Sequence, residues 1–279
     1  MACGELSVPM RGLVVGLLLV SPIFAFSANQ DDNFLRSLRD RVEQSKTLPL
    51  VCRETLLPRQ RLGITIKNGL ILDLVRQRLR HETPTFGMLG VQQSGEPMPC
   101  GVEVEILSYA MNQWKTGIRL ELKAGKRFQL TDHMSESPNG WYHAPVKYLD
   151  SEVQEAQERH TTLAEARAMA KQFTDPDNHL IDKWLELARD QERFPGQIDA
   201  LLEDLGEIPE HPSERAFWVG ALINPTPKIH LAFEIRQRLL LAKTAKDRVQ
   251  IASDALKFSI RRMDPSLSQF SASSGLHAD

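Results

Sequence analysis

The chain has few of the residues from which metal sites are built. Only three of its 279 residues are cysteines, no two of them form a Cys-X-X-Cys pair, and the eight histidines include no His-Glu-X-X-His spacing. Structural and catalytic zinc sites usually collect their ligands through short spacings of these kinds. The sequence therefore predicts no metal site and no zinc-binding module.

Motifs for nucleotide binding and nucleophilic catalysis are also missing. Gly125-Lys126 is the nearest approach to a phosphate-binding Gly-X-X-X-X-Gly-Lys-Ser/Thr loop, but it lacks the upstream glycine and the following hydroxyl residue. No Gly-X-Ser-X-Gly segment presents a serine as a nucleophile. We therefore expect no ATPase module, no protease motif, no cofactor and no catalytic residue, and we predict that the chain is not an enzyme.

A basic balance is missing as well. The net charge is -2, and the pairs Lys126-Arg127 and Arg261-Arg262 are too short to form a basic tract. The sequence shows no internal repeat with a period of about 20 to 50 residues. With 42% hydrophobic and 25% charged residues, the composition is that of an ordinary globular protein. Because the chain has no basic tract and a slightly negative net charge, we expect no nucleic-acid partner.

The N-terminus has the pattern of a targeting segment. Residues 12–26 carry no charge, follow Arg11 and precede the small residues Ser27 and Ala28. This apolar run of about fifteen residues is shorter than a membrane span, which needs about twenty. We predict a cleaved signal peptide over residues 1–28, with a retained membrane anchor as the alternative.

A cleaved signal implies the secretory pathway or an organelle that is reached through it. The phenylalanine beside Ala25 is similar to the targeting signal of algal plastids with secondary membranes, but Asp31-Asp32 is acidic where a transit peptide is basic. After cleavage, Cys52 and Cys100 would remain. They could form a disulfide if their strands were neighbours, although two separate buried thiols are the simpler prediction.

Residues 48–150 form a strand-rich lobe in this interpretation. Apolar runs and alternating segments, separated by turn residues, predict short antiparallel strands, and a helix is predicted at 69–79 by apolar spacings of three and four. Gly125 allows a bulge or a sharp bend between two short strands. The predicted fold class is α+β, with a small, partly closed barrel and one embedded helix. The strands are expected at 48–52, 62–66, 86–91, 102–106, 118–122, 124–130 and 144–149.

The second half of the sequence predicts only helices. A helical lobe over 151–263 forms one unit with the barrel, a further helical segment is expected at 29–47, and the serine-rich tail at 264–279 is expected to be disordered. Trp184 and Trp218 lie in apolar stripes and are predicted to be core residues. The helices are expected at 152–173, 180–188, 198–205, 213–223, 229–241 and 246–263.

The order of several motifs resembles a known family. Phe86-Gly87 is followed by Gly101 in an alternating strand, then by Gly125-Lys126-Arg127-Phe128, and then by Gly140-Trp141-Tyr142. This order is similar to that of the LON substrate-binding domain, the N-terminal domain of Lon proteases. The glycine before a basic pair and an aromatic residue is the most specific element. The resemblance covers roughly 48–262, but Ile66-Lys67-Asn68-Gly69 replaces the Glu-Pro-Arg-Tyr segment of many members.

The resemblance implies a non-catalytic protein that binds polypeptides. Its partners would be polypeptide clients, or a protease or ligase for which it acts as an adaptor in quality control. The binding surface would be a groove between barrel and helices or an exposed strand edge. Two alternatives are a small hydrolase with a site between the lobes and a structural subunit held at a membrane by residues 12–26.

Aromatic residues beside predicted turns are the candidates for peptide binding. Tyr109 and Trp114 flank one hairpin tip, and Trp141 and Tyr142 follow another turn. The alternative is that these rings cap the core of the barrel. Charged residues in the same lobe are read as solvated: we expect Glu103 and Glu105 on the wet face of a strand, and Lys126 and Arg127 in water.

Overall fold

The structure is a computed structural model. It describes residues 45–53, 55–67, 69–92, 94–112, 116–149, 160–175, 179–192, 194–225 and 234–264. The predicted signal segment and most of the predicted helical segment at 29–47 lie outside these residues, and residues 45–47 belong to a strand. Within the described residues, no helix combines the length and the apolar character that a membrane span requires.

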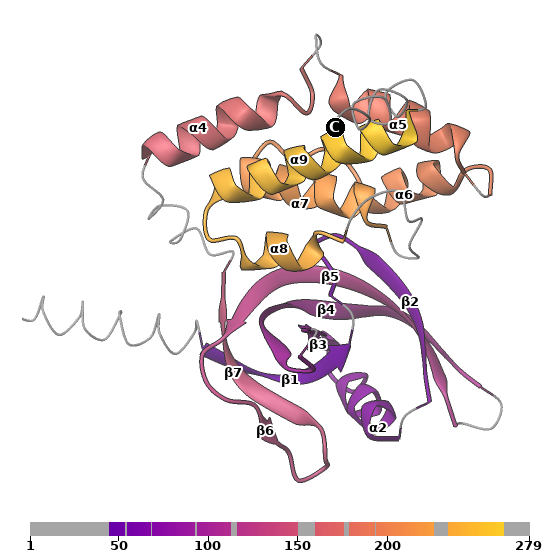
Figure 1. The fold of residues 1–279 in the computed structure, drawn as a ribbon. Coiled ribbons are helices and arrows are strands. Elements are labelled where there is room, and N and C mark those ends of the chain that lie inside the picture. The colour runs from indigo at the N-terminus through magenta and orange to yellow at the C-terminus, as the bar shows by residue number, and fades with distance from the viewer. Residues whose placement is uncertain are drawn as a thin grey trace, which may run out of the picture. The chain divides into compact units, whose positions relative to one another are not determined.

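A ring of paired strands forms the first lobe (Figure 1). β5 pairs with β4, β4 with β3, β3 with β1, β1 with β7, and β7 again with β5, so that the sheet closes on itself. β2 and β6 extend the ring at β5 and β7. The predicted α+β class with a small barrel is therefore confirmed. The strands are β1 (Ser45–Arg53), β2 (Arg61–Ile66), β3 (Thr85–Val91), β4 (Pro97–Met111), β5 (Ile118–Leu130), β6 (Ser135–Glu136) and β7 (Tyr142–Tyr148).

Two expectations about the strands are wrong. β1 and β3 run parallel, with Leu50 opposite Gly87. β2 and the helix α2 (Gly69–Arg78) lie between them in the chain, and a crossover of this length lets the chain re-enter the sheet in the same direction. β4 and β5 are also long strands of 15 and 13 residues. The expected bulge is present, because the register steps from Val102–Arg127 to Val104–Ala124 and leaves Gly125 inside one continuous strand.

Three motif residues meet inside the barrel. Phe128 is fully buried, and a Cβ added to Gly87 or to Gly101 would lie 2.9 Å from its Cζ atom. At Gly101 the added Cβ would also lie 2.3 Å from the carbonyl oxygen of Met88. The two glycines therefore leave space in which a large ring closes the barrel core. Packing around Phe128 therefore accounts for the two glycines of the LON-like motif order, Gly87 and Gly101.

Glu103 lies in a hydrogen-bonded cluster on the barrel wall, so the expectation that it lies on a solvated face is wrong. Its carboxylate accepts hydrogen bonds from Lys46 Nζ at 3.1 Å, Thr85 Oγ1 at 2.9 Å and the Tyr148 hydroxyl at 2.8 Å. These residues belong to β1, β3 and β7. Desolvation alone would raise the pKa of Glu103, but the three hydrogen bonds and the charge of Lys46 outweigh it and lower this pKa. Burial and the bond to Glu103 raise the pKa of Tyr148.

The helical lobe packs around a central buried helix, α7. Ten of its 12 residues are buried, from Pro212 and Ser213 to Ile223. Trp184 donates its indole hydrogen to Ser259 Oγ, and Trp218 donates to the carbonyl oxygen of Gly206, so both are core residues as predicted. The helices are α4 (His160–Lys171), α5 (Leu180–Asp190), α6 (Gln197–Leu205), α7 (Pro212–Ile223), α8 (Arg236–Leu241) and α9 (Ala245–Met263).

The helix ends differ from the expected ones mainly where the described residues stop. The helix expected at 229–241 begins at Arg236 in the structure, and residues 226–233 lie outside the described part. The same holds for 151–159, ahead of α4. Thr244 begins α9, because its side chain accepts a hydrogen bond from the backbone N–H of Asp247.

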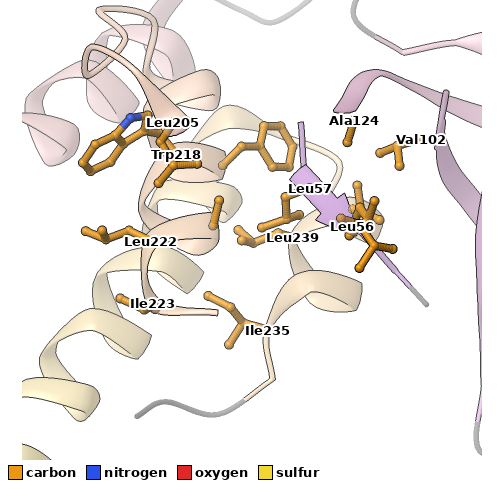
Figure 2. Packing of buried hydrophobic residues seen from close by; sticks show 14 of the residues in the cluster. Leu56, Leu57, Val102, Ala124, Leu205, Trp218, Leu222, Ile223, Ile235 and Leu239 are labelled. Atoms are coloured by element: carbon orange, nitrogen blue, oxygen red, sulfur yellow. The ribbon is translucent and has the colours of Figure 1, made fainter. Parts of the chain in front are cut away.

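The segment after β1 connects the two lobes. Leu56 and Leu57 are completely buried, and Figure 2 shows Leu57 near Leu239 of α8. Gln60 follows, and its amide group donates to the carbonyl oxygens of Asn224 at 2.8 Å and Ala221 at 3.5 Å, at the end of α7. Its Oε1 accepts from the backbone N–H of Leu57 at 2.9 Å. The segment thus holds the end of α7 against the barrel through both apolar packing and hydrogen bonds.

The close approach at Gly101 generates a stability prediction. Gly101→Ala forces its new methyl group against backbone, which cannot rotate away, and we expect a loss of about 2 to 3 kcal/mol of unfolding free energy. Urea unfolding followed by tryptophan fluorescence measures the loss. The control is Gly63→Ala in β2, where an added Cβ meets nothing within 4 Å. Equal stability of the two variants would contradict this packing account.

The Glu103 cluster generates a pH prediction. Because folding lowers the pKa of Glu103, the ionised carboxylate stabilises the fold above the unfolded pKa of about 4.3, and this contribution is lost as pH falls through the folded value. Glu103→Gln should cost about 1 to 3 kcal/mol at pH 7 and progressively less below pH 4.3. Urea midpoints across this pH range test it, with exposed Glu105→Gln as the control. A constant difference would contradict the assignment.

Candidate functional site: a basic cleft between the lobes

A cleft of about 840 Å³ opens between the barrel and the helical lobe. This volume lies in the upper part of the range typical of ligand sites. Residues of the bulged part of β5 line one wall, and residues from α7, α8 and the start of α9 line the other. The lining residues are Pro58, Arg59, Pro99, Cys100, Lys123, Ala124, Gly125, Lys126, Arg127, Gln129, Leu149, Ser213, Glu214, Phe217, Leu240, Leu241, Ala242, Lys243 and Arg248.

The bulge in β5 brings the Gly-Lys-Arg motif to this cleft. Gly125 and Lys126 are exposed on its wall, whereas Arg127 is only 4% exposed. The expectation that Lys126 and Arg127 both lie in water is therefore wrong for Arg127. The bulge turns Arg127 toward the helical lobe, where its guanidinium lies 4.5 Å from the ring centre of Phe217. The most specific part of the sequence motif thus joins the two lobes.

Two buried cations contact the ring of Phe217. The guanidinium of Arg248 is 5.7 Å from the centre of the same ring, and Arg248 is 6% exposed. Its Nε donates to Ser213 Oγ at 2.5 Å and its Nη1 to the carbonyl oxygen of Ala242 at 2.8 Å. Cations within about 6 Å of an aromatic ring centre are attracted by its quadrupole. The floor of the cleft is therefore a cationic and aromatic layer that α7 and α9 hold in place.

Arg59 forms another part of the lining and has an unusual backbone conformation. Its φ of 75° lies in the left-handed region, which a residue with a side chain rarely adopts. Its backbone N–H donates to the carbonyl oxygen of Ala124 at 2.8 Å, and its guanidinium lies 3.4 Å from Glu214 Oε2. Such a conformation persists where the surroundings impose it, and it is frequent at binding sites.

The electrostatic character of the cleft is one-sided. Among the described residues, its lining includes the six cations Arg59, Lys123, Lys126, Arg127, Lys243 and Arg248, against the single carboxylate of Glu214. Lys123, Lys126 and Lys243 are exposed. This local excess occurs in a chain whose net charge is -2. The excess is not visible in the sequence because these residues are distributed over four segments that only the tertiary fold brings together.

The described lining residues offer poor nucleophiles. Burial raises the pKa of the Cys100 thiol, and the nearby charge of Arg127 lowers it by less, so the reactive thiolate is disfavoured. Ser213 Oγ accepts its hydrogen bond from a guanidinium, which does not act as a general base. No histidine lines this cleft in the described part of the chain, and no cluster of potential metal ligands occurs among the described residues. This arrangement is suited to binding.

The predicted aromatic candidates lie elsewhere. Tyr109 on β4 is 57% exposed and Tyr142 on β7 is 48% exposed, while Trp141 is half-buried against the barrel core. None of the three lines the cleft, and Trp114 lies outside the described residues. The core-capping alternative thus applies to Trp141. Tyr109 and Tyr142 remain exposed rings on the barrel.

The two thiols are separate. Cys52 on β1 is exposed and Cys100 on β4 is buried, and both are free. Because β3 lies between β1 and β4 in the sheet, their strands are not neighbours and no disulfide forms. The expectation of two separate thiols is confirmed. The expectation that both are buried is wrong for Cys52, which is exposed.

Comparison with known proteins gives a structural likeness alone. No protein-family model and no curated protein matches the chain. The chain is similar in structure to a Lon N-terminal domain protein from Xanthomonas campestris, with 18% identity, a TM-score of 0.45, and coverage of 74% of this chain and 95% of that one. It is also similar to the N-terminal domain of the Lon protease of the Mycobacterium avium complex, with 15% identity, a TM-score of 0.49, and coverage of 76% and 98%.

The state of Cys100 generates a labelling prediction. In a Cys3→Ser, Cys52→Ser protein, Cys100 should react with a thiol reagent at pH 8 more than about tenfold more slowly than a free cysteine, because its thiol is buried and its pKa is raised. The control is the Cys3→Ser, Cys100→Ser protein, which retains exposed Cys52 and should react faster. Rapid labelling of Cys100 would contradict the burial of its thiol.

Proposed function

We propose that this chain is a non-catalytic binding protein that holds an extended polypeptide segment in the cleft between barrel and helical lobe. The observation that carries the proposal is the cleft itself. It has a volume of about 840 Å³ and a lining that mixes apolar surface with cations. Ligand sites are mainly apolar with a few polar groups that orient the ligand. The likeness of the sequence motifs to a substrate-binding domain agrees with this role.

Apolar residues at the cleft supply the contact surface for such a segment. Leu241 is 47% exposed, and Pro58 and Leu149 also belong to the lining. Covering exposed apolar surface contributes about 25 cal/mol per Å². An extended segment advances about 3.3 Å per residue with side chains on alternate sides. A segment of several residues can therefore place apolar side chains against this surface.

The proposed role is to bind a polypeptide without cleaving it. The thiol of Cys100 and the hydroxyl of Ser213 lack an activating base among the described lining residues. A bound segment would therefore remain intact and accessible to a second protein. We propose that the second protein is a protease or a ligase and that this chain acts as an adaptor in protein quality control or proteolysis.

Leu241 provides a test that separates the cleft from the exposed tyrosines. Leu241→Ser should weaken binding of a permanently unfolded model protein about fivefold, because the apolar contact that Leu241 makes with the bound segment is lost. The matched control is Phe194→Ser, which alters an exposed apolar residue of the helical lobe outside the cleft. Fluorescence anisotropy measures both affinities, and circular dichroism confirms that both variants are folded.

The double variant Tyr109→Ala, Tyr142→Ala completes this test. If the segment binds in the cleft, the double variant keeps the affinity of the unaltered protein. If the double variant loses binding while Leu241→Ser retains it, the segment binds at the barrel surface, and the assignment to the cleft is wrong.

A further inference from the structure

The charges of the cleft indicate which polypeptide segments it selects. Exposed Lys123, Lys126 and Lys243 line it, and none of them forms an ion pair with another described residue. Among the described lining residues only Glu214 carries a negative charge, and it lies 3.4 Å from Arg59. Lys126 Nζ lies 5.8 Å from the ring centre of Tyr148, but Lys126 is exposed. The potential of the three exposed lysines favours a negative ligand.

We infer that the cleft selects acidic polypeptide segments in which carboxylate side chains are interspersed with apolar ones. The inference rests on the proposed function and specifies its substrate class. Side chains of an extended segment alternate between two faces. One face can contact apolar residues such as Leu241 while the other carries Asp or Glu to Lys123 and Lys126 on β5. Segments that are only apolar lack the charged partners, and basic segments are repelled.

The same residues disfavour a nucleic acid as the occupant. Single-stranded nucleic acids are bound by exposed aromatic rings that stack on bases, in addition to cations. Phe217 is the one aromatic residue of the described lining, and it is 3% exposed because the helical lobe and the two arginines cover it. Apolar aliphatic residues at the cleft suit side chains of a polypeptide better than phosphate groups.

Three labelled peptides with one apolar frame test the inference on the full chain. Leucine alternates with glutamate, with glutamine or with lysine over roughly ten residues, and anisotropy gives the three affinities. Exposed ion pairs are individually weak, so three lysines together should favour the glutamate peptide over the glutamine peptide about tenfold. This preference should shrink as salt rises from about 0.05 M to about 0.5 M, because ions screen exposed charges.

Charge-reversed variants locate the preference. Lys123→Glu, Lys126→Glu, Lys243→Glu should abolish it or shift it toward the lysine peptide. The control has the same change in net charge at three exposed lysines outside the cleft, namely Lys67→Glu, Lys147→Glu, Lys171→Glu, and should retain the preference. Because all six positions are exposed, both variants should fold, and thermal unfolding checks this.

The outcomes separate this inference from the proposed function. If the glutamine peptide binds as tightly as the glutamate peptide and Leu241→Ser weakens both, the cleft binds polypeptides without selecting acidic ones, and the inference alone is wrong. If the control variant loses the preference as fully as the cleft variant, the selection comes from overall charge and the inference is again wrong. If no peptide binds but inorganic polyphosphate or a labelled oligonucleotide does, the proposed function is wrong as well.

Discussion

The buried amide of Gln60 is the interaction on which the arrangement of the two lobes depends. It accepts from the backbone of its own segment and donates to the carbonyl oxygens of Ala221 and Asn224, where α7 ends. Those carbonyl groups are buried, and leaving such a group without a partner costs about 1 to 3 kcal/mol. Because Gln60 is itself 2% exposed, the end of α7 has a fixed position against the barrel.

The cleft follows from this attachment. The end of α7 is held at Gln60, and its beginning carries Ser213, Glu214 and Phe217 over the bulged part of β5. Leu57 and Leu239 both approach Gly220, where an added Cβ would lie 2.9 Å from the first and 2.3 Å from the second. Tight packing thus fixes the end of α7 against the barrel, whereas the beginning of α7 lines the cleft, with Phe217 and its two arginines in the lining.

Cations and apolar residues have distinct roles in the lining of the cleft. Arg127 and Arg248 are buried and contact Phe217, so they help to hold the two lobes together. The exposed lysines instead give the cleft its positive electrostatic potential. A site built in this way attracts charged segments over a distance and holds apolar side chains at contact. Steering by charge acts mainly on the rate of encounter, while apolar contact acts on the duration of the complex.

The sequence by itself determined the fold class, most helices and the bulge at Gly125, because these depend on local periodicity, on glycine and on proline. It also determined that Trp184 and Trp218 are buried, since each lies in an apolar helical stripe. Only the tertiary structure decided that β1 and β3 are parallel, that Phe128 packs over Gly87 and Gly101, and that Glu103 holds three strands together. The cleft was not predictable because its cations come from segments far apart in the chain, and their juxtaposition is a property of long-range packing.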